Sequence, residues 1–153
     1  MKFLECKVPP ALLFAISTGL MWVTFKYLKS FSFSHPILPW IAKALFSIGI
    51  LIGIAGVWEF WKKKTTVDPH RPEKASSFVN SGIYQFTRNP MYLGLLIGLI
   101  GILFFFANPI NILLVIGFIL YMNRFQIIPE ERAMTKKFGE DFLDYKESVR
   151  RWI

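Results

Sequence analysis

Polar and aromatic residues that could hold a charged ligand gather in residues 81–94 of this 153-residue chain. Pro90 suits the first turn of a helix, so Asn89 or Thr87 is expected to cap it, and unpaired backbone N–H groups there could hold an anion. Tyr84 and Tyr92 flank this helix start, and aromatic faces attract cations or stack on planar rings. The stretch therefore predicts a binding site for a charged ligand at the start of a helix.

A second polar stretch, Pro129–Arg132, follows the last long apolar run and contains Glu130 and Glu131. Acidic residues at a helix start complement the helix dipole, and this is the simpler explanation of the pair. Alternatively, one carboxylate pairs with Arg88, Arg124 or a ligand ammonium, because charges at membrane depth are usually paired or functional. We expect the two polar stretches to meet at one membrane surface.

Several glycines occupy positions where a close approach is expected. Gly82 and Gly94 lie in the first polar stretch and remove side chains where a ligand or a second backbone would come near. Gly49 and Gly53 form a small-xxx-small pair, which predicts packing against another helix. A ligand lying in the groove beside this pair is the alternative.

The composition excludes a soluble domain, because the mean hydropathy is +0.43, 54% of residues are hydrophobic and 16 are Phe. The net charge of +8 comes from basic residues beside apolar runs, so anionic lipid headgroups are expected as partners and nucleic acid is not. The single cysteine, Cys6, cannot form an intrachain disulfide and is interpreted as an inert thiol. His35 lies in a loop without neighbouring ligands, so no metal site is expected.

Four apolar runs are long enough, or nearly so, to cross a bilayer, since a spanning helix needs about 20 residues. They are Pro10–Leu28, Leu38–Trp61, Met91–Phe106 and Ile112–Ile128. The last two are separated by a tight turn and predict a helical hairpin. The fold class is therefore all-α: a polytopic membrane protein with four transmembrane helices.

The polar segments complete this topology. Residues 62–88 form a long loop, and the tail after Ile128 places Phe138, Phe142, Tyr145, Val149 and Trp152 along one face of an amphipathic C-terminal helix. Gly139 is expected to separate this helix from a shorter one that begins near Pro129.

The distribution of basic residues places the loop, the tail and both termini on the cytoplasmic side, and we expect a prokaryotic inner membrane. Glu59, next to a lysine run, is interpreted as a solvated interfacial charge. The chain is interpreted as a single domain, with residues 1–61 as a two-helix scaffold and residues 62–153 as the ligand-binding core.

A set of short motifs in order resembles the isoprenylcysteine carboxyl methyltransferase family, including its small prokaryotic members and its phospholipid methyltransferase relatives. The motifs are Gly82-Ile83-Tyr84, Thr87-Arg88-Asn89-Pro90-Met91-Tyr92-Leu93-Gly94, Glu130-Glu131, Phe138-Gly139, Tyr145 and Val149-Arg150-Arg151-Trp152. The resemblance covers about half of the chain, from Thr65 to the C-terminus.

The resemblance implies an integral membrane enzyme that transfers a methyl group from S-adenosylmethionine to a lipophilic acceptor in the bilayer. It implies a cofactor site formed by Tyr84, Asn89, Pro90, Tyr92, Gly94, Glu130 and Glu131. Arg88 and Arg124 are the expected catalytic residues, and either would orient the acceptor if it is an isoprenoid or lipid carboxylate. If the acceptor is a phospholipid-type amine, an acidic residue would have to accept its proton. Asn89 stands where the best-known members have His, so a role that needs a titrating imidazole is in doubt here.

Two other functions compete with this one. Membrane sterol reductases share a related architecture and an Arg-containing motif but bind NADPH, which would need further basic contacts for its phosphates. A non-enzymatic helical scaffold or transport subunit is the other alternative. Its expected intramembrane polar pathway is missing, because the apolar runs contain few ionisable residues away from their ends.

Overall fold

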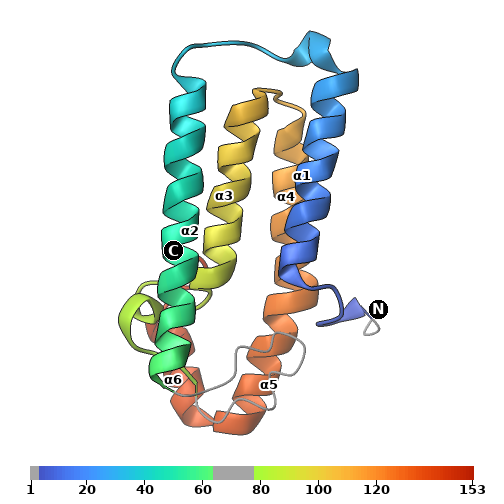
Figure 1. Cartoon of the computed structure of the whole chain (residues 1–153). Helices are drawn as coiled ribbons and strands as arrows, with labels where there is room; N and C mark the ends of the chain where they lie inside the picture. Colours follow the sequence, from blue (N-terminus) through green and yellow to red (C-terminus); the bar gives the residue numbers. More distant parts are fainter. Residues whose placement is uncertain (1–3, 64–77) are drawn as a thin grey trace.

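The computed structural model describes residues 4–63 and 78–153, and this part of the chain is helical throughout, without strands. Four helices run side by side along the bundle: α1 (Pro10–Tyr27), α2 (Leu38–Lys62), α3 (Pro90–Phe106) and α4 (Asn111–Tyr121) (Figure 1). The turns that join α1 to α2 and α3 to α4 lie at one end of the bundle. The all-α prediction is confirmed.

Two of the described helices are long and apolar enough to cross a membrane, namely α2 and the continuous helix Asn111–Phe138. Helix α3 is shorter, with 17 residues, and extends about 25 Å at 1.5 Å per residue. It is apolar along its length, as the sequence predicts for a helix within a bundle.

The continuous helix consists of α4, the π-helical turn η5 (Met122–Ile127) and α5 (Ile128–Phe138). The prediction that an apolar helix ends at Ile128 is therefore wrong in its boundary. Pro129 has no N–H to donate to the Phe125 carbonyl four residues earlier, and its ring crowds that carbonyl. The wider π-helical turn lies where this conflict arises, and Cys6 N–H donates to Phe125 O at 2.8 Å. The helix bypasses Pro129 instead of stopping there.

Helices α2 and α3 pack with their backbones in close approach. A Cβ atom added to Gly49 would lie 2.5 Å from Gly94 O, and a Cβ added to Gly94 would lie 2.5 Å from Gly49 O. Further along, a Cβ on Gly101 would lie 2.9 Å from Ala42 O. The predicted packing role of Gly49 is confirmed, and Gly94 is its partner.

Two buried asparagines hold the turns at the far end of the bundle. The Asn108 side-chain amide donates to Leu28 O at 3.1 Å, which ties the α3–α4 turn to the end of α1 and the short 3₁₀ turn η2 (Lys29–Phe31). Asn111 is fully buried and hydrogen-bonds with Thr24 Oγ1. These bonds pair Asn108 and the oxygen of Asn111 inside an otherwise apolar region, while Asn111 Nδ2 has no partner among the described residues.

The opposite end carries the 3₁₀ turn η4 (Gly82–Gln85) and helix α6 (Glu140–Ser148), which follows α5 after Gly139 at a positive φ of 57°. Phe142, Tyr145 and Val149 form a buried cluster. Trp152 packs against the main core of the bundle. The break at Gly139 is confirmed, and Phe138, Phe142, Tyr145 and Val149 do pack together. The predicted helix is wrong in its extent, because α6 ends at Ser148 and Trp152 packs against the bundle instead.

The α2–α3 contact makes a prediction about stability. Gly49→Ala is expected to lower the free energy of unfolding by about 1–3 kcal/mol, because its methyl group meets backbone that cannot move aside. Gly117→Ala is the matched control, since a Cβ there meets nothing within 4 Å and removing a helical Gly stabilises by about 0.5–1 kcal/mol. Thermal unfolding in detergent measures both. Equal effects of the two changes would contradict the close packing.

Candidate active site

A cavity of about 470 Å³ lies where the start of α3, the turn η4 and helices α5 and α6 meet the ends of α1 and α2. This volume is in the range of small-molecule sites, about 300–1,000 Å³. Among the described residues, the polar side chains that line it are Tyr84, Arg88, Asn89, Tyr92, Glu130, Glu131 and Tyr145. Its remaining described lining is apolar and includes Val57, Phe60, Phe78, Val79, Met134 and Phe142. The cavity is therefore amphipathic.

Six of the predicted site residues line this cavity together, although they lie up to 47 positions apart: Tyr84, Arg88, Asn89, Tyr92, Glu130 and Glu131. Three others lie outside its described lining. Pro90 is buried in the first turn of α3, and Gly94 faces the α2 backbone. The Arg124 side chain is 54% exposed, with its Nη1 3.6 Å from a carboxylate oxygen of Glu5.

Glu131 is a bridge between two guanidinium groups. Its Oε1 accepts from Arg88 Nη2 at 2.9 Å and from Arg151 Nε at 3.0 Å, and its Oε2 accepts from Arg151 Nη2 at 2.8 Å. The hydrogen bond from Arg151 to Glu131 raises the pKa of the Arg151 guanidinium. The pairing with Arg88 that the sequence left open is present, and both carboxylate oxygens of Glu131 are occupied.

Arg88 connects the start of α3 to the C-terminal residues. Its Nη1 donates to Lys146 O at 2.6 Å and to Val149 O at 2.5 Å, and its backbone N–H donates to Arg150 O at 3.0 Å. Its Nε is buried without a hydrogen-bond partner in the part of the chain that the structure describes. An unpaired buried donor is costly, so this N–H is a candidate for contact with a ligand.

Glu130 has a different environment from its neighbour. Its Oε1 accepts from Tyr92 OH at 2.6 Å and from Gln126 Nε2 at 2.5 Å. Gln126 lies four residues before Glu130 in the same continuous helix, so its side chain can reach the Glu130 carboxylate. Within the described residues no hydrogen bond or ion pair is formed by Oε2 of Glu130. This carboxylate is thus oriented by two donors and has one oxygen available for a cation.

The start of α3 has no side-chain cap. The Asn89 side chain donates to Arg151 O at 2.9 Å, and its backbone N–H donates to Thr87 Oγ1 at 3.2 Å. The N–H groups of Met91 and Tyr92 in the first turn have no acceptor within the helix. These N–H groups can bind an anion beside the cavity.

Glu59 of α2 holds the turn η4, which carries Tyr84, through a hydrogen bond from Ser81 that we call the latch. Glu59 is 7% exposed, and its Oε2 accepts from Ser81 Oγ at 2.8 Å. The prediction that Glu59 is a solvated charge is wrong, because the turn η4 packs over it. Tyr145 OH then donates to Tyr84 O at 2.7 Å from the other side of the cavity. Burial raises the pKa of both tyrosines, so they are neutral in the physiological range.

The sequence analysis did not predict the hydrogen-bond partners Gln126, which binds Glu130, and Arg151, which binds Glu131. Gln126 is a polar residue in an apolar run one turn before Glu130, and that spacing was the available signal. Arg151 was part of a quoted motif, but its distance of 20 positions from Glu131 gave no indication of an ion pair.

The fold and the cavity define a class: a helical protein whose apolar bundle carries an amphipathic ligand site at one end. Residues 37–141 match the phospholipid methyltransferase family. The chain therefore belongs to this family of methyltransferases.

Curated relatives agree with this assignment. An uncharacterized protein from Haemophilus influenzae is 44% identical over 63 residues, 41% of this chain and 100% of that protein. The Protein-S-isoprenylcysteine O-methyltransferase A of Arabidopsis thaliana is 35% identical over 80 residues, 50% of this chain and 39% of that protein. The Protein-S-isoprenylcysteine O-methyltransferase of Dictyostelium discoideum is 28% identical over 137 residues, 88% of this chain and 54% of that protein. The chain thus spans 39% and 54% of these two enzymes.

The ion-pair bridge makes a prediction about folding. Glu131→Ala is expected to lower the free energy of unfolding by about 3–5 kcal/mol, because it leaves buried positive charge uncompensated. Glu147→Ala removes an exposed carboxylate from α6 and serves as the control. Thermal unfolding in detergent compares the two. An unchanged midpoint for Glu131→Ala would rule out a structural role for the bridge.

The latch makes a second prediction. In Gly82→Ala, the new Cβ would lie 2.5 Å from Glu59 Cδ, at a residue whose φ is +58°. Either the Glu59 carboxylate or the turn η4 must then shift, and either shift breaks the contact that holds the cavity wall at Tyr84. We expect limited proteolysis within residues 78–88 to become faster than in the wild type, with Gly19→Ala as a control in open space. Equal cleavage rates would contradict the latch.

Proposed function

We propose that this chain is an integral membrane methyltransferase that uses S-adenosylmethionine and modifies a lipophilic acceptor in the bilayer. The observation that carries the proposal is the carboxylate of Glu130, whose Oε1 accepts two hydrogen bonds while its Oε2 accepts none from the described residues. It lies in a cavity with apolar walls, beside the start of α3, which has no side-chain cap. This arrangement offers a negative group, free N–H donors and aromatic faces to one ligand. A zwitterion with a planar ring uses all three.

The chain's own residues divide these tasks. Oε2 of Glu130 binds the ammonium group of the cofactor, and the N–H groups of Met91 and Tyr92 bind its carboxylate. The rings of Tyr84 and Tyr92 contact its adenine or sulfonium. Glu131 holds the site together through its two arginines and does not contact the ligand. When bound, S-adenosylmethionine supplies the methyl group.

Methyl transfer from a sulfonium depends on positioning and exclusion of water more than on a strong acid or base. The apolar walls at Val57, Phe60 and Phe142 exclude water from the cavity. The Nε–H of Arg88 orients the acceptor if it is a carboxylate, and Glu130 receives a proton if the acceptor is an amine. Arg124 has no supported role in this scheme, because its side chain points away from the described cavity lining.

The bundle is proposed to cross the membrane four times, with α1 and α3 spanning beside the two longer helices. Both shorter helices are apolar and lie alongside the long ones over most of the bundle (Figure 1). The cavity end carries the larger share of the basic residues, which favours a cytoplasmic location for it. The cavity would then meet a water-soluble cofactor on one side and membrane lipid on the other.

The cavity favours this cofactor over NADPH. Arg88 is the only basic side chain in the described lining, and Glu131 already neutralises it. The phosphates of NADPH would need further cations. A purely structural scaffold would not need a carboxylate buried with an open oxygen.

Isothermal titration of the detergent-solubilised protein with S-adenosylhomocysteine, and in parallel with NADPH, tests the proposal. We expect binding of S-adenosylhomocysteine alone. Glu130→Gln is expected to weaken it roughly 10- to 100-fold, because a charge-assisted hydrogen bond contributes about 1.5–3 kcal/mol. Glu140→Gln changes an exposed carboxylate and should have no effect.

Absence of heat with S-adenosylhomocysteine would refute the cofactor assignment. Unchanged affinity in Glu130→Gln would refute the role of this carboxylate while leaving the cofactor assignment intact.

A further inference from the structure

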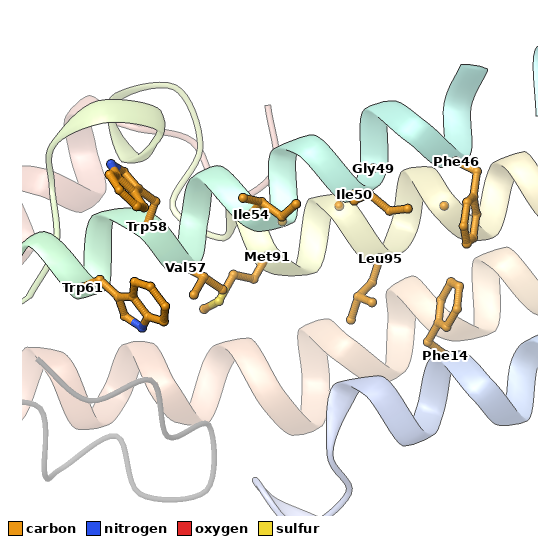
Figure 2. A pocket seen from close by; sticks show the side chains of 13 residues that line it. Phe14, Phe46, Gly49, Ile50, Ile54, Val57, Trp58, Trp61, Met91 and Leu95 are labelled. Carbon is orange, nitrogen blue, oxygen red and sulfur yellow. The ribbon is translucent and has the colours of Figure 1, made fainter. Parts of the chain in front are cut away.

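A second cavity, of about 450 Å³, lies between α1 and α2 with α3 as its floor (Figure 2). Its described lining contains no charged side chain. It comprises Phe14, Phe46, Gly49, Ile50, Gly53, Ile54, Val57, Trp58, Trp61, Met91, Gly94, Leu95 and Gly98. We call this cavity the apolar groove. Among the described lining side chains, the indoles of Trp58 and Trp61 carry the only N–H groups, so the groove suits a hydrocarbon.

The two ends of the groove differ. At one end, Phe14 from α1 and Phe46 from α2 point toward one another across the α3 floor (Figure 2). A Cβ added to Gly98 would lie 3.6 Å from Phe14 Cε2 and 3.7 Å from Phe46 Cδ2, so both rings cover Gly98. Trp58 and Trp61 lie at the other end. The rings of the two phenylalanines therefore mark the end of the groove, over Gly98.

The groove adjoins the candidate active site, because Gly53, Val57, Met91 and Leu95 line both cavities. From Val57 to Phe46 the groove follows 11 residues of α2, or about 16 Å at 1.5 Å per residue. This length is about half of a hydrocarbon core of about 30 Å. A chain that leaves the active site along the groove thus meets the two rings near the middle of the membrane.

The floor of the groove is smooth because α2 and α3 meet through glycines. Gly49 and Gly94 are in backbone contact, and a Cβ on Gly53 would meet nothing within 4 Å. The alternative that the sequence left open for Gly49 and Gly53, a ligand beside the pair, is thus compatible with their packing role. The same residues bring the helices together and leave a channel along the seam.

We propose that Phe14 and Phe46 act as a stop that sets the length of the acceptor's hydrocarbon chain. A single chain lies in the groove, its reactive head in the candidate active site and its end against the two rings. The volume of the groove is in the lower part of the range for one small ligand, which fits a single chain. This inference rests on the proposed function and adds the acceptor class: a single-chain amphiphile of limited length.

Binding of radiolabelled prenylated cysteine derivatives to the protein in lipid nanodiscs tests the stop. The series carries geranyl, farnesyl or geranylgeranyl chains and is measured with S-adenosylhomocysteine present. In the wild type, affinity rises with chain length and stops rising once the chain reaches the rings. Phe46→Ala is expected to raise the affinity for the longest chain, relative to the shortest, roughly tenfold, since each buried group adds discrimination of that order.

Two further variants make the result specific. Ile50→Trp puts a larger ring into the groove nearer the active site and is expected to shift the preference toward the shortest chain. Phe31→Ala removes an exposed phenyl ring from η2, outside the groove, and should leave the length preference unchanged. If Phe46→Ala and Ile50→Trp shift the preferred chain length in opposite directions, a general loss of stability cannot explain both results.

The same length dependence in the wild type, Phe46→Ala and Ile50→Trp would overturn the stop. Absence of prenyl binding to a wild-type protein that still binds S-adenosylhomocysteine would overturn the groove as the chain site. Loss of S-adenosylhomocysteine binding by the wild type would instead refute the proposed function, so the two failures are distinguishable.

Discussion

The ion pairs between Glu131 and two arginines hold together parts of the chain that would otherwise separate. Arg88 belongs to the start of α3, Glu131 to α5 and Arg151 to the C-terminal residues. All three lie at the end of an apolar bundle, where a charge without a partner is costly. Because each carboxylate oxygen of Glu131 is occupied, the neighbouring Glu130 is left as the carboxylate that can receive a ligand. One bridge thus ties three parts of the chain together beside the cavity and occupies one member of the acidic pair.

A proline in the last long helix has a comparable influence on the site. Pro129 prevents a regular α-helical hydrogen bond to Phe125 O, and the helix responds with a π-helical turn. Gln126 lies within this turn and holds Glu130. Residues from both ends of the described chain contact the turn: Cys6 N–H binds the Phe125 carbonyl, and the Trp152 indole donates to Asn123 at 3.1 Å. The π-helical turn before Pro129 therefore contacts both ends of the described chain and positions Glu130.

The close packing of α2 and α3 serves both stability and access. Glycines allow the two backbones to touch, which no side chain at Gly49 or Gly94 would permit. The seam they form is bordered by larger side chains from α1 and α2, and it leads to the cavity at Glu130. A membrane protein cannot use water exclusion to bring its helices together, so small residues at contacts are the expected means. We propose that the same seam also receives a hydrocarbon chain.

The sequence by itself determined the helical class, the approximate ends of α1, α2 and α3, the break at Gly139 and the apolar face of the tail. These features depend on hydropathy, periodicity and turn residues, which are local properties. Motif order also indicated the family, and six residues predicted for the site do line one cavity. Only the tertiary structure decided that Glu131 is a bridge, that Glu59 is buried under η4 and that the helix continues past Pro129. Those outcomes depend on which distant groups meet, and the spacing of residues along a chain does not contain that information.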